Sequence, residues 1–381
     1  MIMLFPNEKY AILELYRMTE NKKTTPEHIY SIDVLRGIAA LCVVFWHWQH
    51  FFYIDGKLSQ DFIISNQPFY DLLYPLYNHG YLAVQLFFAI SGFIFFWLYS
   101  SKIAEGKISI CEFSIDRFSR LYPLHFLTFF ITLLLQKLYF RENEFYFVYP
   151  ENDMYHAILN ILLISAWGFQ HGWSFNAPIW SVSIEVLLYI IFFIVCTINI
   201  NKVLVSALLV AFSFYLLPFN SNISEGVMTF FCGGLAFFVL NSATKIFNQI
   251  TLIMISLLSL IASWYLPVYF HGNEISLISC ISFPITILFL AIVSYTKNNF
   301  LKPLRFIGNL SYSSYLIHFP LQVIFIMASK YLGYTNDIYY SPWILLLFVL
   351  ILILLSNLSY NYFEIPMQRY IRGGVRKKIQ R

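Results

Sequence analysis

Apolar residues occur in runs of about 20 from the beginning of the chain to its end, and polar residues gather in the segments between the runs. A helix of about 20 apolar residues is long enough to cross the hydrocarbon core of a bilayer. The pattern therefore predicts an all-α fold, a polytopic bundle of about ten transmembrane helices. The predicted spans are roughly residues 34–53, 80–100, 121–138, 179–198, 203–217, 226–242, 250–268, 275–295, 310–330 and 342–362.

The positions of the basic residues predict an orientation. With the N-terminus in the cytoplasm, the cytoplasmic segments hold all of the 24 Lys and Arg residues except Lys57, Lys137, Arg141 and Lys330. This agrees with the positive-inside rule and places both termini in the cytoplasm. Residues 156–167 are apolar but short, so we interpret them as a re-entrant or interfacial piece, with a full span as the alternative.

Composition agrees with this picture. The chain of 381 residues is 59% hydrophobic and 12% charged, whereas soluble domains are about a quarter charged. We predict a cytoplasmic N-terminal segment at 1–30, one transmembrane domain at 31–365 and a basic cytoplasmic tail at 366–381. The five cysteines and the histidines have no spacing typical of a disulfide framework or a metal site, so we expect no metal.

Two ionisable residues lie in the first predicted span. Arg36 and His47 are about 16 Å apart along a helix, and charge at membrane depth is expensive and usually marks a functional path. Glu185 in the fourth predicted span lies at about the same depth as His47. A carboxylate beside an imidazole would fix its tautomer and raise its basicity, as for a general base. The alternative is a structural polar pair that joins two helices.

A second group of basic residues lies at the predicted cytoplasmic side. Arg117 and Arg120 are three residues apart and therefore share one helix face. With Arg36 they would place three guanidinium groups at one mouth of the bundle. Arginine binds phosphate in a bidentate manner, so coenzyme A or a nucleotide is a suitable ligand. The alternative is that these residues contact lipid headgroups.

Five short sequence motifs follow one another along the chain. The late pattern is Asn-Leu-Ser-Tyr-Ser-Ser-Tyr-Leu-Ile-His, which ends at His318. Together the patterns cover most of the chain, which makes them far more specific than any one alone. The other four are Arg36 followed by His47, Phe-Phe-x-x-Ser-Gly-Phe at 87–93, Arg117-x-x-Arg120, and Trp-Ser-x-Ser-x-Glu at 180–185. In this order the five motifs resemble those of the acyltransferase-3 family of bacterial integral-membrane O-acyltransferases.

The resemblance implies transfer of an acyl group, usually acetyl, from cytosolic acetyl-CoA to a carbohydrate hydroxyl on the outer side of the membrane. It implies that His47 is the catalytic histidine, with Arg36 as its signature partner, and that Arg117 and Arg120 bind the donor. We expect no permanently bound cofactor, and as partners acyl-CoA, a carbohydrate or glycolipid acceptor and the lipid bilayer, but no nucleic acid. The expected location is the bacterial inner membrane.

Other residues carry weaker predictions. Ser91 either permits close helix packing or lines a tunnel for the acyl group, and His318 is either a structural histidine or part of the donor channel. We assign Trp180, Ser183 and Tyr122 to substrate binding, although a tryptophan at an interface is often only a belt residue. A transporter or flippase that uses the buried His, Glu and Arg as a proton or anion path is the alternative function.

Overall fold

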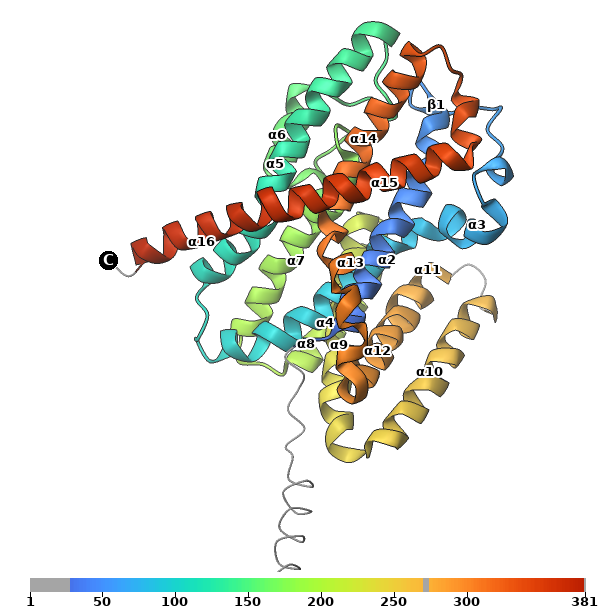
Figure 1. Cartoon of the computed structure of the whole chain (residues 1–381). Coiled ribbons are helices and arrows are strands. Elements are labelled where there is room, and N and C mark those ends of the chain that lie inside the picture. The colour runs from blue at the N-terminus through green and yellow to red at the C-terminus, as the bar shows by residue number, and fades with distance from the viewer. Residues whose placement is uncertain (1–27, 270–273, 380–381) are drawn as a thin grey trace, which may run out of the picture.

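The computed structural model describes residues 28–269 and 274–379. The predicted N-terminal segment, apart from its last three residues, lies outside this part of the chain. The described residues form a bundle of helices with one hairpin, β1 (Tyr53–Ile54) paired with β2 (Lys57–Leu58). The predicted all-α fold is therefore confirmed. Figure 1 shows α2 (Tyr30–Trp46) in the middle of the bundle.

Nine helical segments within the described residues are long and apolar enough to cross a membrane. At the fifth predicted span the structure has α8 (Lys202–Leu216), an apolar helix of 15 residues. The third segment, α5 (Ile110–Asn143), extends well beyond both ends of its predicted span. The other long helices are α4 (Ala83–Ala104), α7 (Trp180–Thr197), α9 (Ser221–Ile246), α10 (Gln249–Tyr269), α12 (Phe283–Lys297), α14 (Ser311–Tyr331) and α15 (Pro342–Ser359).

Shorter helices connect these elements. The apolar segment 156–167 contains most of α6 (Met154–Ile161) and a short 3₁₀ turn, and it does not form a long helix. The chain leaves α15 through a π-helical turn, η9 (Tyr360–Glu364), and enters α16 (Ile365–Ile379). The remaining short elements are η1 (His47–Phe52), η2 (Ile64–Asn66), α3 (Tyr70–His79), η3 (Gly80–Leu82), η4 (Ser165–Trp167), η5 (Ala177–Ile179), α11 (Glu274–Leu277), η6 (Ile278–Ser282), η7 (Asn298–Leu304), α13 (Arg305–Asn309) and η8 (Asn336–Tyr340).

Local sequence explains where several helices begin. Ser109 accepts a hydrogen bond from the backbone N–H of Glu112, whose side chain accepts one from the backbone of Ser109, so a capping box starts α5. Asn201 and Asn220 are simple N-caps of α8 and α9, whose side-chain oxygens accept hydrogen bonds from backbone N–H groups of the first turn. These caps satisfy backbone donors that would otherwise be unpaired at a helix end.

Small residues allow α4 and α9 to approach each other closely. A Cβ atom added at Gly92 would lie 1.8 Å from the carbonyl oxygen of Phe230, and one at Gly233 would lie 2.0 Å from that of Ala89. Both positions therefore require glycine, because any side chain would overlap the backbone of the facing helix. This contact fixes the position of α4, which carries Ser91, in the middle of the bundle.

Candidate active site

His47 and His318 form a hydrogen-bonded pair between α2 and α14. His47 is the first residue after the last turn of α2, and its Nδ1 lies 2.8 Å from Nε2 of His318, which is fully buried. The Nδ1 atom of His318 lies 2.6 Å from the carbonyl oxygen of Tyr315. The histidine expected in the donor channel is therefore the direct partner of His47.

The partners of the two imidazoles determine where their protons lie. A carbonyl oxygen can only accept, so Nδ1 of neutral His318 carries the proton and its Nε2 is an acceptor. Nδ1 of His47 must then donate to His318. In the neutral pair this leaves Nε2 of His47 without a proton, in the form that a general base or nucleophile needs.

A further set of hydrogen bonds holds His47 from the other side. Gln322 donates from Nε2 to the carbonyl oxygen of His47 at 2.7 Å, and its Oε1 accepts from Nδ1 of His50 at 3.0 Å. Tyr149 donates its hydroxyl to Nε2 of His50 at 3.4 Å. Burial raises the pKa of Tyr149 well above its usual value, so this hydroxyl keeps its proton. These three residues were missed at the sequence level, although Gln322 lies one helical turn after His318.

Glu185 does not have the partner that its depth predicted. Its Oε1 accepts hydrogen bonds from Ser91 at 3.2 Å and from the hydroxyl of Tyr189 at 2.5 Å. The expected contact with His47 is replaced by the bond of His47 to His318. The reason is packing: α14 lies against α2, whereas α7, which carries Glu185, lies against α4 and α9. Equal depth in the membrane does not decide which helices are neighbours.

Two adjoining cavities share several lining residues, and neither His47 nor His318 is among the described residues that line them. The narrow cavity has a volume of about 130 Å³ and is lined by Ser91, Glu185, Tyr189 and Tyr315, among others. The wide cavity has a volume of about 380 Å³ and includes Asp33, Arg305, Glu364 and Arg372 in its lining. Arg36, Arg117 and Arg120 line both cavities. The three predicted arginines therefore meet where the cavities join.

Two of these arginines are held in different ways. Arg36 donates to the carbonyl oxygen of Gly308 at 2.7 Å and to Oγ of Ser311 at 3.0 Å, so it also ties α2 to the start of α14. Arg117 donates to the hydroxyl of Tyr99 at 2.7 Å, and its guanidinium carbon lies 5.1 Å from the centre of that ring. The Nε atom of Arg117 is buried and has no hydrogen-bond partner among the described residues.

The three residues predicted to bind substrate are not among the described residues that line either cavity. Ser183 is fully buried, and its Oγ accepts from the backbone N–H of Ala166 at 3.3 Å. Trp180 packs against Phe88 with ring centres 6.4 Å apart, and the Tyr122 ring is stacked on Phe118 at 4.5 Å. All three side chains pack against neighbouring residues in this structure. Ser183 also holds the loop that precedes α7 through its hydrogen bond with Ala166.

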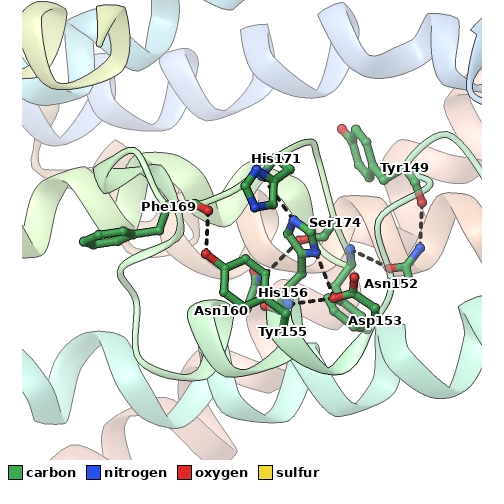
Figure 2. A network of polar contacts seen from close by, with 10 residues as sticks. Tyr149, Asn152, Asp153, Tyr155, His156, Asn160, Phe169, His171 and Ser174 are labelled. Carbon is green, nitrogen blue, oxygen red and sulfur yellow. Dashed lines mark hydrogen bonds and ion pairs between the residues drawn. The ribbon is translucent and has the colours of Figure 1, made fainter. Parts of the chain in front are cut away.

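The loop before α7 is stabilised by a polar network, which Figure 2 shows. Asp153 accepts hydrogen bonds from the backbone N–H of His156 and from its ring Nδ1, both at 2.8 Å. These bonds lower the pKa of Asp153 below its usual value. The backbone N–H of His171 donates to Nε2 of His156 at 3.2 Å. Beside these bonds, Asn152 donates from Nδ2 to the carbonyl oxygen of Tyr149 at 2.6 Å.

Glu151, Asp153 and His156 could offer ligand atoms within 4.8 Å of one another. Both ring nitrogens of His156 already have partners, and a metal ion would have to displace the proton that Nδ1 donates to Asp153. The donor set therefore fits a hydrogen-bonded loop better than a metal site.

Comparison with known proteins identifies the family of this chain. Residues 29–360 match the acyltransferase-3 family, which is described as an acyltransferase domain. The chain therefore belongs to the acyltransferase-3 family. This confirms the resemblance on which the sequence-level assignment rested.

Curated relatives match parts of the chain or most of it. O-acetyltransferase OatA of Staphylococcus aureus is 23% identical over 91% of this chain and 58% of its own length. Acyltransferase MdmB of Streptomyces mycarofaciens is 29% identical over 42% of this chain and 38% of its own length. Protein 2 in the picA locus of Rhizobium radiobacter is 37% identical over 28% of this chain and 44% of its own length. The chain thus spans between 38% and 58% of the length of these relatives. No solved structure matches it significantly.

Proposed function

We propose that this member of the acyltransferase-3 family is a membrane O-acyltransferase. It moves an acyl group, most simply acetyl, from cytosolic acyl-CoA to a hydroxyl group of an extracytoplasmic carbohydrate or glycolipid. The observation that carries the proposal is the His47–His318 pair, in which His318 contacts Tyr315, a lining residue of the cavity that three arginines also line. The names of the relatives OatA and MdmB, an O-acetyltransferase and an acyltransferase, support the reaction class.

The cavities support a donor that enters from the arginine side. An acyl-CoA has a polyanionic nucleotide head and a long, thin, uncharged arm that ends in the thioester. The wide cavity offers arginines for the phosphates. The narrow cavity suits the arm, and its lining includes Tyr315, whose ring centre lies 6.0 Å from that of His318. The thioester would thus arrive next to the histidine pair.

His47 supplies the base in this mechanism. Its unprotonated Nε2 takes the proton of the acceptor hydroxyl as the oxygen attacks the thioester carbonyl. The new C–O bond forms, the C–S bond breaks, and the proton passes from His47 to the leaving thiolate of coenzyme A. The same lone pair could instead carry the acyl group briefly. A single-turnover reaction with labelled acetyl-CoA separates the routes, because only the second leaves label on the protein.

Glu185 has a positioning role in this proposal. It accepts hydrogen bonds from Ser91 and Tyr189, both of which line the narrow cavity. Glu185 itself lines that cavity together with Arg36, Arg117 and Arg120. We therefore assign it to shaping the passage for the arm of the donor rather than to the proton transfer itself.

The proposal is tested by His47→Ala in the purified full chain, reconstituted in liposomes and supplied with labelled acetyl-CoA and a soluble carbohydrate acceptor. Transfer should fall by roughly two to four orders of magnitude or disappear, because the base is lost. His79→Ala, which removes an exposed histidine, is the matched control and should retain activity. Retained transfer by His47→Ala would refute the assignment. Wild-type protein that carries a solute across the liposome without acyl transfer would instead indicate a transporter.

A further inference from the structure

The wide cavity carries more positive charge than the acidic residues around it neutralise. Its lining contains the carboxylates Asp33 and Glu364. Asp33 is hydrogen-bonded to His28 and lies 3.5 Å from the guanidinium of Arg36. The lining also contains five arginines, which are Arg36, Arg117, Arg120, Arg305 and Arg372.

The second carboxylate is held by hydroxyl groups. Glu364 is buried in the π-helical turn after α15 and accepts hydrogen bonds from Ser313 and, at 3.2 Å, from Ser359. Arg372 is paired with Asp116 at 3.2 Å. Among the described residues, Arg117, Arg120 and Arg305 therefore have no ion pair of their own, although they line the same cavity.

These charges lie at two places. Arg117 and Arg120 on α5 also line the narrow cavity, so they stand at the inner end of the wide one. Arg305, the first residue of α13, and Arg372 on α16 line only the wide cavity. Arg372 donates to Oγ of Ser119 at 3.0 Å, which holds α16 against α5. Arg305 is exposed and free to meet a ligand.

We propose that the wide cavity binds two separate phosphate groups of one ligand. The diphosphate of the donor lies at Arg117 and Arg120, and a phosphomonoester lies at Arg305, with Arg372 at its side. The inference rests on the proposed acyl-CoA donor, in which the phosphomonoester is the 3′-phosphate of the ribose. A phosphomonoester carries up to two negative charges near neutral pH, and it is the group that gains most from a further arginine. The protein therefore selects donors that have this phosphate.

The test compares acetyl-CoA with 3′-dephospho-acetyl-CoA in the purified full chain. The wild type should have a KM for acetyl-CoA that is lower by roughly tenfold to a hundredfold, as for one charge-assisted contact. In Arg305→Gln the KM for acetyl-CoA should rise to that for the dephospho donor, whose own KM stays unchanged. Arg369→Gln, which removes an exposed arginine of α16 outside the cavity lining, is the matched control and should keep the preference.

Three results would overturn the inference. Equal KM values for the two donors in the wild type would exclude a phosphomonoester site while leaving the proposed function intact. A preference that persists in Arg305→Gln would place the site elsewhere. Absence of transfer from both donors would refute the donor class, and the proposed function would fail together with this inference.

Discussion

Replacing His318 tests whether it positions His47 or binds the donor. In His318→Ala the acceptor for Nδ1–H of His47 is lost, and so is the bond to the carbonyl oxygen of Tyr315. A buried donor without a partner costs about 1–3 kcal/mol. If this cost falls on the transition state, kcat should decrease roughly 5- to 150-fold. The KM for the donor should hardly change, because His318 is not among the residues that line the two cavities, whereas the arginines that would hold the phosphates are.

His318→Gln is the conservative variant for this test. Its Oε1 can occupy the place of Nε2 and accept from His47, so it should recover part of the lost kcat. The assay is steady-state transfer from labelled acetyl-CoA by purified protein in liposomes, with the elution profile in detergent as a check on folding. A raised KM with unchanged kcat in His318→Ala would refute the positioning role and favour the donor-channel assignment made from the sequence. Equal activity of the Ala and Gln variants would show that the hydrogen bond itself is unimportant.

Two further predictions concern the framework of the site. Gly92→Ala should lower the melting temperature in detergent and reduce activity, because the added Cβ would overlap the backbone of Phe230. Such overpacking typically costs about 1–3 kcal/mol of stability. An unchanged melting temperature would contradict the close contact between α4 and α9. The pKa of Asp153 in the folded protein lies below the ordinary value of 3.8. The bonds of Asp153 to His156 therefore stabilise the loop fully at pH values above 3.8, and this stabilisation is lost as the pH falls through the pKa of the folded state. Hydrogen exchange of residues 150–175 should therefore accelerate only at acidic pH, and Asp153→Asn should remove most of that pH dependence. An identical dependence of the exchange rate on pH in the variant would refute this explanation.

Much of the fold was predictable because the bilayer imposes a simple rule on sequence. Long apolar runs have to be helices, since a spanning segment must satisfy its own backbone hydrogen bonds. The ends of helices were less predictable. α5 begins at Ile110, well before its apolar run, because the capping box at Ser109 starts the helix in a polar segment. α8, with 15 residues, is by contrast as short as the apolar run at 203–217 predicted.

The arginine group of the site was predictable from the sequence, whereas the partner of His47 was not. The spacing of Arg117 and Arg120 places both on one face of a single helix, and the structure brings them together with Arg36 at one cavity junction. Glu185 was assigned to His47 from its depth, and the structure gives it Ser91 and Tyr189 instead. Depth follows from the position along a helix, whereas the partner depends on which helices pack together.

By itself, the sequence determined that the chain is a helical membrane protein, which family it belongs to and which residue types carry its chemistry. Hydrophobic runs and short motifs are local properties, so they can be read without knowledge of the fold. Only the tertiary structure decided that His318 is the partner of His47 and that Gln322 and His50 support it. These contacts join residues more than 270 positions apart, and they exist because α14 packs against α2.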